Sequence, residues 1–198
     1  MISHTPELLS HRCDEHIEVM ASLVSALAVP FESLVQMCGE AIEKNGKIVL
    51  FGNGGSAADA QHIATELTVR FSVDRPPIAA LALTTDTSAI TACGNDFGFD
   101  AIFSRQVEAL VRKDDVAIGI STSGASRNVL NGLDAAHRIG ARTVGFTGAS
   151  GGEMQSICDV LLKVPSSTTA RIQEAHIFLG HTLCEALELR LGYGNLVR

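Results

Sequence analysis

The sequence predicts an α/β fold, in which a doubly wound parallel sheet of about five strands carries an N-terminal helical arm. Short apolar runs alternate along most of the chain with stretches of helical periodicity, the pattern of a parallel sheet covered by helices on both faces. The first 46 residues show helical periodicity alone. The length of 198 residues suits one domain. A chain of this length buries roughly 70% of its unfolded surface, so no disulfide or structural metal is needed for folding.

Two amphipathic helices are expected in the arm, residues 1–46, one on each side of Pro30. Gly46 is the expected end of the second. These helices have no strand partners of their own, so they either pack on the sheet or form an interface with another copy of the chain. The apolar residues that recur at helical spacing are Ile17, Met20, Val24 and Leu27 before the proline, and Phe31, Leu34, Val35, Cys38 and Ile42 after it.

The α/β core and C-terminal helix are expected in residues 47–198. Strands are predicted at 47–51, 78–83, 116–120, 143–147 and 160–164, and helices at 57–71, about 84–93, 101–111, 127–139 and 169–191. Residues 94–98, Gly-Asn-Asp-Phe-Gly, are expected to be a loop. No repeat or linker interrupts the pattern, so residues 1–198 are predicted to form a single domain.

The composition argues against several classes of partner. The chain has 15 Lys and Arg against 22 Asp and Glu, a formal net charge of −7. This acidity disfavours binding to nucleic acid or to an anionic membrane surface, and no apolar run approaches the ~18 residues of a membrane span. The five cysteines are scattered without a Cys-x-x-Cys pair, as in a reducing compartment. We therefore expect a cytoplasmic protein without nucleic-acid or membrane partners.

Two Gly/Ser/Thr-rich turns follow predicted strands and open helices. They are residues 52–56, Gly-Asn-Gly-Gly-Ser, and 121–126, Ser-Thr-Ser-Gly-Ala-Ser. At such positions free backbone N–H groups and the helix dipole favour an anion, so the global negative charge does not exclude a phosphorylated ligand. Neither turn contains Gly-Lys-Ser/Thr, which excludes a nucleotide P-loop and favours a phosphomonoester. The hydroxyls that can add donors are those of Ser56, Ser121, Thr122, Ser123 and Ser126.

Two alternatives apply to these turns. Each alone is compatible with ordinary helix capping and tight-turn chemistry. The first also matches the dinucleotide pattern Gly52-x-Gly54-x-x-Ala57. That pattern needs an acidic residue near the end of the second strand, and Asp74 precedes the strand while Asp86 is too distant. The dinucleotide interpretation is therefore disfavoured.

A second group of polar residues lies on two predicted helices. His62 and Glu66 are four positions apart and share a helix face. Gln173 and His181 lie eight apart on the last helix, about 12 Å along its axis, so they meet at one site only if that helix crosses it or another chain contributes. His, Glu and Gln are ligands of first-row metals. The simpler interpretation of His62 and Glu66 is an exposed polar pair, and spacing alone does not join the two helices.

Four motifs together resemble the sugar-isomerase (SIS) domain family and, within it, the sedoheptulose 7-phosphate (phosphoheptose) isomerases. They are residues 52–62, 94–98, 120–124 and 171–174, in the same order as in the family. The resemblance extends over nearly the whole chain and is strongest from about residue 47 to 189. It implies isomerisation of sedoheptulose 7-phosphate to D-glycero-D-manno-heptose 7-phosphate for bacterial nucleotide-activated heptose, and a homotetramer with active sites between subunits.

The resemblance also implies the roles of individual residues. Glu66 and His181 correspond to the catalytic pair, and His62, Glu66, Gln173 and His181 to ligands of one divalent metal per subunit, usually zinc. We expect Glu66 to remove the carbon-bound proton and His181 to act as acid to the oxygen, through an enediolate. The expected substrate contacts are Asn53, Gly54, Gly55, Ser56, Glu66, Asn95, Asp96, Ser121, Thr122, Ser123, Ser126 and Gln173.

Two other functions stay open beside this one. A non-catalytic SIS scaffold of the DnaA initiator-associating type shares the fold, but such relatives lack the residues matched here by Glu66 and His181. A different phosphosugar isomerase or lyase is the third possibility. The sequence departs from the family at Ala125, where many relatives have Asn in the phosphate loop, and at Ala170, where some have Asp. Neither departure affects the acid and base positions.

Overall fold

The structure is a computed structural model that describes residues 4–193. Its strands form a five-stranded parallel sheet in the order β2-β1-β3-β4-β5. This confirms the doubly wound sheet predicted from the sequence; residues 1–3 and 194–198 of the predicted domain lie outside the described residues. The strands are β1 Ile48–Gly52, β2 Ala80–Ala82, β3 Val116–Ile120, β4 Arg142–Thr147 and β5 Val160–Lys163. The helices are α1 Thr5–Glu43, α2 Gly55–Thr68, α3 Thr87–Phe97, α4 Ile102–Leu110, α5 Arg127–Ile139 and α6 Thr169–Arg190, with 3-10 turns η1 Phe99–Ala101 and η2 Gly152–Ser156.

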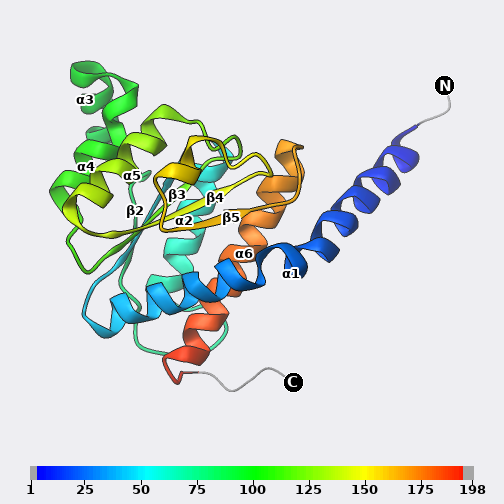
Figure 1. Ribbon diagram of the computed structural model, residues 1–198, viewed down its shortest axis with the longest axis horizontal. Helices are drawn as coiled ribbons and strands as arrows, with labels where there is room; N and C mark the ends of the chain where they lie inside the picture. Colours follow the sequence, from blue (N-terminus) through cyan, green and yellow to red (C-terminus); the bar gives the residue numbers. More distant parts are fainter. Residues whose placement is uncertain (1–3, 194–198) are drawn as a thin grey trace.

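Helices cover both faces of the sheet (Figure 1). Side chains that alternate between the two faces create two cores. Ile48 and Leu50 of β1 point to the layer formed by α1, α2 and α6, whereas Val49 and Phe51 point to α4 and α5. Both faces of β1 and β3 are fully buried, which explains why their sequences are apolar runs without alternation.

The N-terminal arm is one continuous helix, so the prediction of two helices was wrong. Pro30 lies inside α1 and removes one backbone donor, yet the helix continues. The reason is packing: Leu27 and Leu34, on either side of the proline, are both buried in the same core cluster. Tertiary burial therefore outweighs the local preference for a break.

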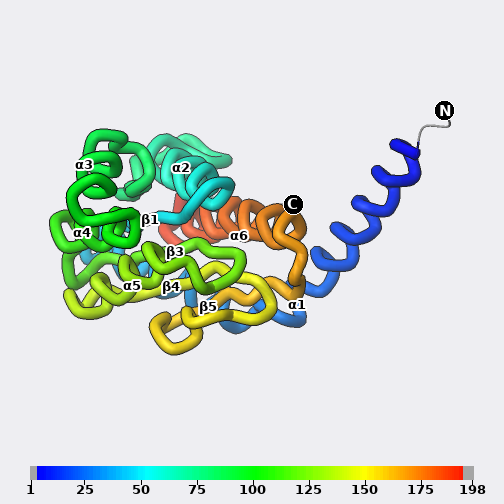
Figure 2. The backbone as a smooth tube through the Cα atoms, turned by 90° about the horizontal axis from the view of Figure 1, so that it is seen from above, coloured from blue at the N-terminus to red at the C-terminus, as the bar shows by residue number. Residues whose placement is uncertain are grey.

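The N-terminal half of α1 projects away from the sheet in two perpendicular views (Figures 1 and 2). Several of its apolar side chains face solvent in the single chain: Leu8, Leu9, Ile17 and Val24 are 55%, 65%, 63% and 77% exposed. By length and composition α1 is the one described helix that could cross a membrane, a test that packed helices of globular proteins also pass. An exposed apolar stripe of this kind is typical of an interaction surface.

The segment 94–98 is not the loop that the sequence predicted. α3 begins after Asp86, whose carboxylate accepts a hydrogen bond from the Ala89 backbone N–H, and continues to Phe97. It ends at Gly98, which has φ +88°. Gly94 stays helical, and the glycine that terminates α3 is the one in the left-handed region.

Candidate functional site

The two Gly/Ser-rich turns lie side by side at the carboxyl edge of the sheet. They follow β1 and β3, which are hydrogen-bonded neighbours. The chain continues from β1 to β2 on one side of this pair and from β3 to β4 and β5 on the other. Ligands of doubly wound sheets bind in the crevice at such a switch point. The turns are also joined directly: Asn53 and Asn128 exchange two side-chain hydrogen bonds of 2.8 Å. Asn128 is buried in the first turn of α5 and was not predicted as a site residue.

The first turn, residues 52–56, presents backbone rather than side chains. Gly54 has φ +56° and precedes the first residue of α2, and Gly54 and Gly55 are both exposed. Ser56 is only 4% exposed and packs inward against Gly52. Its side chain is therefore not accessible for the substrate contact that the sequence predicted. What the turn offers an anion is the exposed N-terminus of a 14-residue helix.

The second turn, residues 121–126, presents hydroxyls. Ser123 is exposed and Ser126 partly exposed, whereas Ser121 is as buried as Ser56, at 4% exposed. The Ser121 Oγ lies 3.0 Å from the Ser126 Oγ and 3.4 Å from the Ser123 Oγ. Ser126 is the N-cap of α5, but its side chain makes no capping bond, which leaves the hydroxyls grouped at the helix N-terminus. Gly124, with φ +66°, is packed tightly against the carbonyl of Gly151, where a Cβ would come within 2.3 Å. Ala125 donates its backbone N–H to the Ser123 Oγ at 3.2 Å, a bond within the turn that does not depend on the side chain at position 125.

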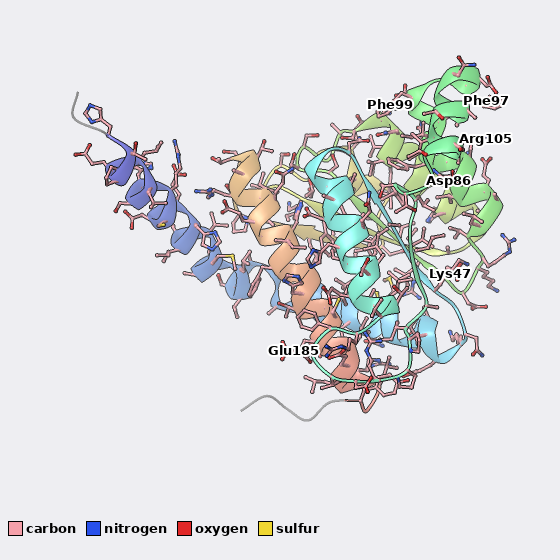
Figure 3. All side chains as sticks on the ribbon, turned by 180° about the vertical axis from the view of Figure 1, so that it is seen from behind. Lys47, Asp86, Phe97, Phe99, Arg105 and Glu185 are labelled. Carbon is pink, nitrogen blue, oxygen red and sulfur yellow. The ribbon has the colours of Figure 1, made fainter. Side chains whose placement is uncertain are left out.

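The structure brings together three of the predicted acid, base and metal residues. The Nε2 of His62 lies 3.3 Å from Oε1 of Glu66 on α2 and 2.9 Å from Nε2 of His181 on α6. α2 and α6 lie side by side (Figure 3). Their close approach depends on Gly180, which packs on Ile63, the neighbour of His62. Spacing in the sequence predicted the pair on α2 but could not predict this packing.

Gln173 lies apart from these three residues. Its amide nitrogen is beside Gly55, where a Cβ would come within 2.5 Å of it. It therefore borders the first turn, two helical turns from His181, and no described contact joins it to His62 or Glu66. Within the single chain the predicted set of four ligands is incomplete.

The three residues are of the type that binds zinc, yet their spacing is that of a hydrogen-bonded chain. Two zinc–nitrogen bonds at a tetrahedral angle would place the nitrogen atoms roughly 3.3 Å apart, whereas the two Nε2 atoms lie 2.9 Å apart. In agreement, residues 4–193 contain no group of three His, Cys, Asp or Glu side chains arranged to hold a metal. The donor chemistry fits a divalent ion after a small separation of the two imidazoles.

Two neighbours of this cluster were not predicted from the sequence. The Phe71 ring stacks on His181 with centroids 5.4 Å apart and an interplanar angle of 27°. Asp59 lies one turn before His62 and has a buried Oδ2 without a hydrogen-bond partner. Burial raises the pKa of Asp59 to about 6, although the charge of His62 opposes the shift. No motif identifies Phe71, whereas Asp59 belongs to the first family motif, residues 52–62.

Asn95 and Asp96 are not brought to this cluster within one chain. They lie in the last turn of α3, exposed, with the Asn95 amide donating to the Asp96 carboxylate at 2.7 Å. The adjacent Phe97 and Phe99 are 61% and 60% exposed and stand at the outer corner of α3 and η1 (Figure 3). Within the single chain, no described contact joins Asn95 or Asp96 to His62, Glu66 or His181.

Comparison with known proteins gives consistent results. The model of the SIS domain family matches residues 13–148. A phosphoheptose isomerase of Paramagnetospirillum magneticum is 54% identical over 180 residues, 91% of this chain and 94% of that protein. The phosphoheptose isomerase of Aquifex aeolicus is 53% identical over 88% of this chain and 91% of its own length.

Solved structures are similar over nearly the same extent. Phosphoheptose isomerase GmhA from Neisseria gonorrhoeae has a TM-score of 0.89 at 44% identity, covering 93% of this chain and 99% of that one. A phosphoheptose isomerase from Francisella tularensis has a TM-score of 0.90 at 35% identity, covering 93% and 98%.

Proposed function

The chain belongs to the SIS domain family and, within it, to the phosphoheptose isomerases, and from this premise we propose how its residues interconvert sedoheptulose 7-phosphate and D-glycero-D-manno-heptose 7-phosphate. It is an isomerase, and the non-catalytic scaffold alternative is disfavoured. The observation that carries the assignment of residues is the convergence of Glu66, His62 and His181 on two packed helices, one of which, α2, begins at the first turn. An anion site next to a carboxylate and an imidazole is what a phosphosugar isomerase requires.

The two turns bind the phosphate of the substrate. The exposed backbone of Gly54 and Gly55, at the start of α2, and the hydroxyls of Ser123 and Ser126, at the start of α5, supply neutral donors at neighbouring helix N-termini. Ser121 is buried and positions these two hydroxyls through its own Oγ. Thr122, in the same turn, adds a further hydroxyl. Asn53 contributes by holding the turns together through Asn128. The acidic protein thereby binds an anion without a lysine.

Glu66 and His181 carry out the proton transfers. Conversion of the ketose to the aldose removes a proton from C1, protonates the oxygen on C2, and returns a proton to C2 while the oxygen on C1 loses one. We assign Glu66 as the base at carbon and His181 as the acid at oxygen, each contributing roughly 10²–10⁴-fold. Phe71 supports the imidazole of His181 from one side.

A divalent metal, usually zinc in the family, is part of the proposal. His62, Glu66 and His181 would hold it, with Gln173 as the further ligand. When bound, such an ion stabilises negative charge on the two reacting oxygens as a Lewis acid. His62 has no proposed proton-transfer role of its own, and its imidazole completes the donor set next to Glu66.

We also propose a cytoplasmic homotetramer with sites between subunits. The exposed stripe of α1 (Leu8, Leu9, Ile17, Val24) supports it, as do the exposed rings of Phe97 and Phe99. Asn95 and Asp96, beside those rings, would then contact the substrate of a neighbouring subunit.

Incubation of the purified protein with sedoheptulose 7-phosphate tests the function. We expect aldoheptose 7-phosphate to form, followed by proton NMR of the anomeric region. A folded, metal-loaded oligomer that makes no product would favour the scaffold alternative. Turnover of a pentose or hexose phosphate in its place would favour a different phosphosugar isomerase.

A further inference from the structure

A buried ion pair lies between α6 and the segment that follows α2. Arg75 and Glu188 have side chains that are 0% and 1% exposed, and the Arg75 Nε donates to Glu188 Oε1 at 2.9 Å. Two charges removed from water are unfavourable unless their remaining polar atoms are also hydrogen-bonded. The partners of those atoms therefore define what the pair connects.

Arg75 binds the end of the helix that carries Glu66. Its Nη2 donates to the Glu66 carbonyl at 2.8 Å, and its Nη1 to the Leu67 carbonyl at 2.9 Å. These carbonyls belong to the last turn of α2, where no further helical N–H groups are available. The last turn of α2 has no basic residue of its own. The Arg75 guanidinium thus fixes the backbone of Glu66 from outside the helix.

Glu188 binds the residue that supports His181. Its Oε1 accepts the Phe71 backbone N–H at 3.1 Å, and its Oε2 accepts the backbone N–H and the hydroxyl of Ser72 at 3.2 and 2.6 Å. The ring of Phe71 stacks on His181. Glu188 and His181 are seven residues apart on α6, two helical turns, and so share a face. Figure 3 shows the segment after α2 passing across the C-terminal part of α6.

We propose that Arg75 and Glu188 are positioning residues that set the placement of Glu66 relative to His181. The inference rests on the proposed roles of those two residues. Neither Arg75 nor Glu188 touches the reacting atoms; Arg75 fixes the backbone of the base, and Glu188 fixes Phe71 and through it the imidazole. A small displacement of catalytic groups is costly to turnover, on the order of 10²-fold for about 1 Å.

A purely structural ion pair behaves differently from a positioning pair when both charges are replaced. Apolar replacement of a buried pair is often neutral for stability. In the double variant Arg75→Met with Glu188→Leu, we therefore expect a folded protein whose kcat falls roughly 10- to 100-fold while KM changes less than about threefold. A folded double variant with kcat within twofold of wild type would overturn the proposal.

The matched control is the ion pair of Lys47 and Asp115 at the amino edge of the sheet (Figure 3). Asp115 is likewise buried and accepts backbone N–H groups, from Lys47 and Arg112. It borders no predicted site residue. Lys47→Met with Asp115→Leu should leave kcat within twofold of wild type. Only Asp115 of this pair is fully buried, since the Lys47 side chain is 28% exposed. A comparable loss of kcat in this control would mean that replacing an ion pair away from the site also lowers kcat, and would overturn the proposal.

Phe71→Leu keeps the proposal testable if the double variant does not fold. This variant leaves Arg75 and Glu188 intact and removes only the ring on His181. In Phe71→Leu we expect kcat to fall by the same factor as in the double variant and the His181 ring resonances to shift in NMR. In Phe71→Tyr, which keeps an aromatic ring, we expect kcat to return to the wild-type value. Unshifted His181 resonances with wild-type kcat would overturn the positioning proposal. Shifted resonances with wild-type kcat would instead overturn the catalytic role assigned to His181.

Discussion

The Nε2 atoms of His62 and His181 lie 2.9 Å apart, although the two residues are 119 positions apart in the sequence. Two unprotonated imidazole nitrogens do not attract each other at this distance, so the contact holds either a proton or a cation. The packing of α2 against α6 therefore places this contact beside the carboxylate of Glu66. The predictions below concern this contact and the turns next to it.

Gly180→Ala should separate α2 from α6. A Cβ at this position would come within 2.4 Å of Ile63 Cδ1 and 2.6 Å of its Cγ1, so Ile63 or the helix must move. We expect a loss of about 1–3 kcal/mol in the free energy of unfolding, measured in urea. Activity should fall roughly 10- to 100-fold because the histidines move apart.

Gly94→Ala is the matched control for that variant. Gly94 also lies in a helix, but no atom lies within 4 Å of a Cβ built there. Alanine should therefore raise stability by about 0.5–1 kcal/mol. Equal destabilisation by both substitutions would contradict the argument from close packing.

Helix and strand periodicity predicted most of the fold and only part of the site. The apolar runs of β1 and β3 predicted their burial, and the turns after them predicted an anion site. The prediction of a helix break at Pro30 was wrong because the packing of Leu27 and Leu34 outweighs the local effect of the proline. Phe71 and Asn128 could not be predicted, since their contacts depend on where α6 and the first turn lie. The spacing of His62 and Glu66 along one helix predicted that they lie together. That His181 joins them and that Gln173 does not depends on how α6 packs on α2, which the sequence does not show.

Glu66→Gln should abolish turnover while the protein stays folded and keeps its oligomeric state. The amide has the same shape as the carboxylate but cannot accept the proton from carbon. Exchange of the C1 proton of sedoheptulose 7-phosphate with solvent deuterium should be lost together with product formation. Near-normal activity of this variant, or proton exchange at the wild-type rate, would exclude Glu66 as the base.

Removal of divalent metal should lower activity without unfolding the protein. The candidate ligands lie on α2 and α6, whose packing depends on buried Ile63 and Leu183 rather than on an ion. After chelation and verified metal loss, we expect reduced turnover that zinc restores, with the thermal midpoint changed by only a few degrees. Undiminished activity in the metal-free protein would show that no ion takes part.

Asp59→Asn should stabilise the protein at neutral pH and not at pH 4. Burial raises the pKa of Asp59 from 3.8 to about 6. The folded state therefore binds the proton more tightly than the unfolded state does, and its stability falls as pH rises from about 4 to 6. The full shift corresponds to about 3 kcal/mol; because the side chain is only half-buried, we expect roughly 1–2 kcal/mol.

Urea unfolding of the metal-free wild type and Asp59→Asn at pH 4 and pH 7.5 measures this difference. The comparison removes the contributions of other carboxylates, which the two proteins share. An equal difference in stability at both pH values would mean that the charge of Asp59 is not the cause.

Asn128→Ala should weaken phosphate binding although Asn128 is buried beneath the turns. It removes both hydrogen bonds to Asn53 and the bond from the Val129 N–H to Asn128 Oδ1. Leaving these groups unpaired costs about 1–3 kcal/mol. We expect KM for the substrate, and the inhibition constant of inorganic phosphate, to rise together by roughly tenfold or more.

A double-mutant cycle with Asn53→Ala distinguishes this joining role from direct contact with substrate. If Asn53 acts through Asn128, the two losses of phosphate affinity overlap. The double variant then binds phosphate no more weakly than the single variant with the larger loss. Asn131→Ala is the control, since Asn131 lies one turn further along α5 and donates one exposed bond to the Asp100 carbonyl. Because that bond involves neither turn, phosphate inhibition should be unchanged in Asn131→Ala. Additive losses for Asn53 and Asn128 would show that they act on the ligand independently.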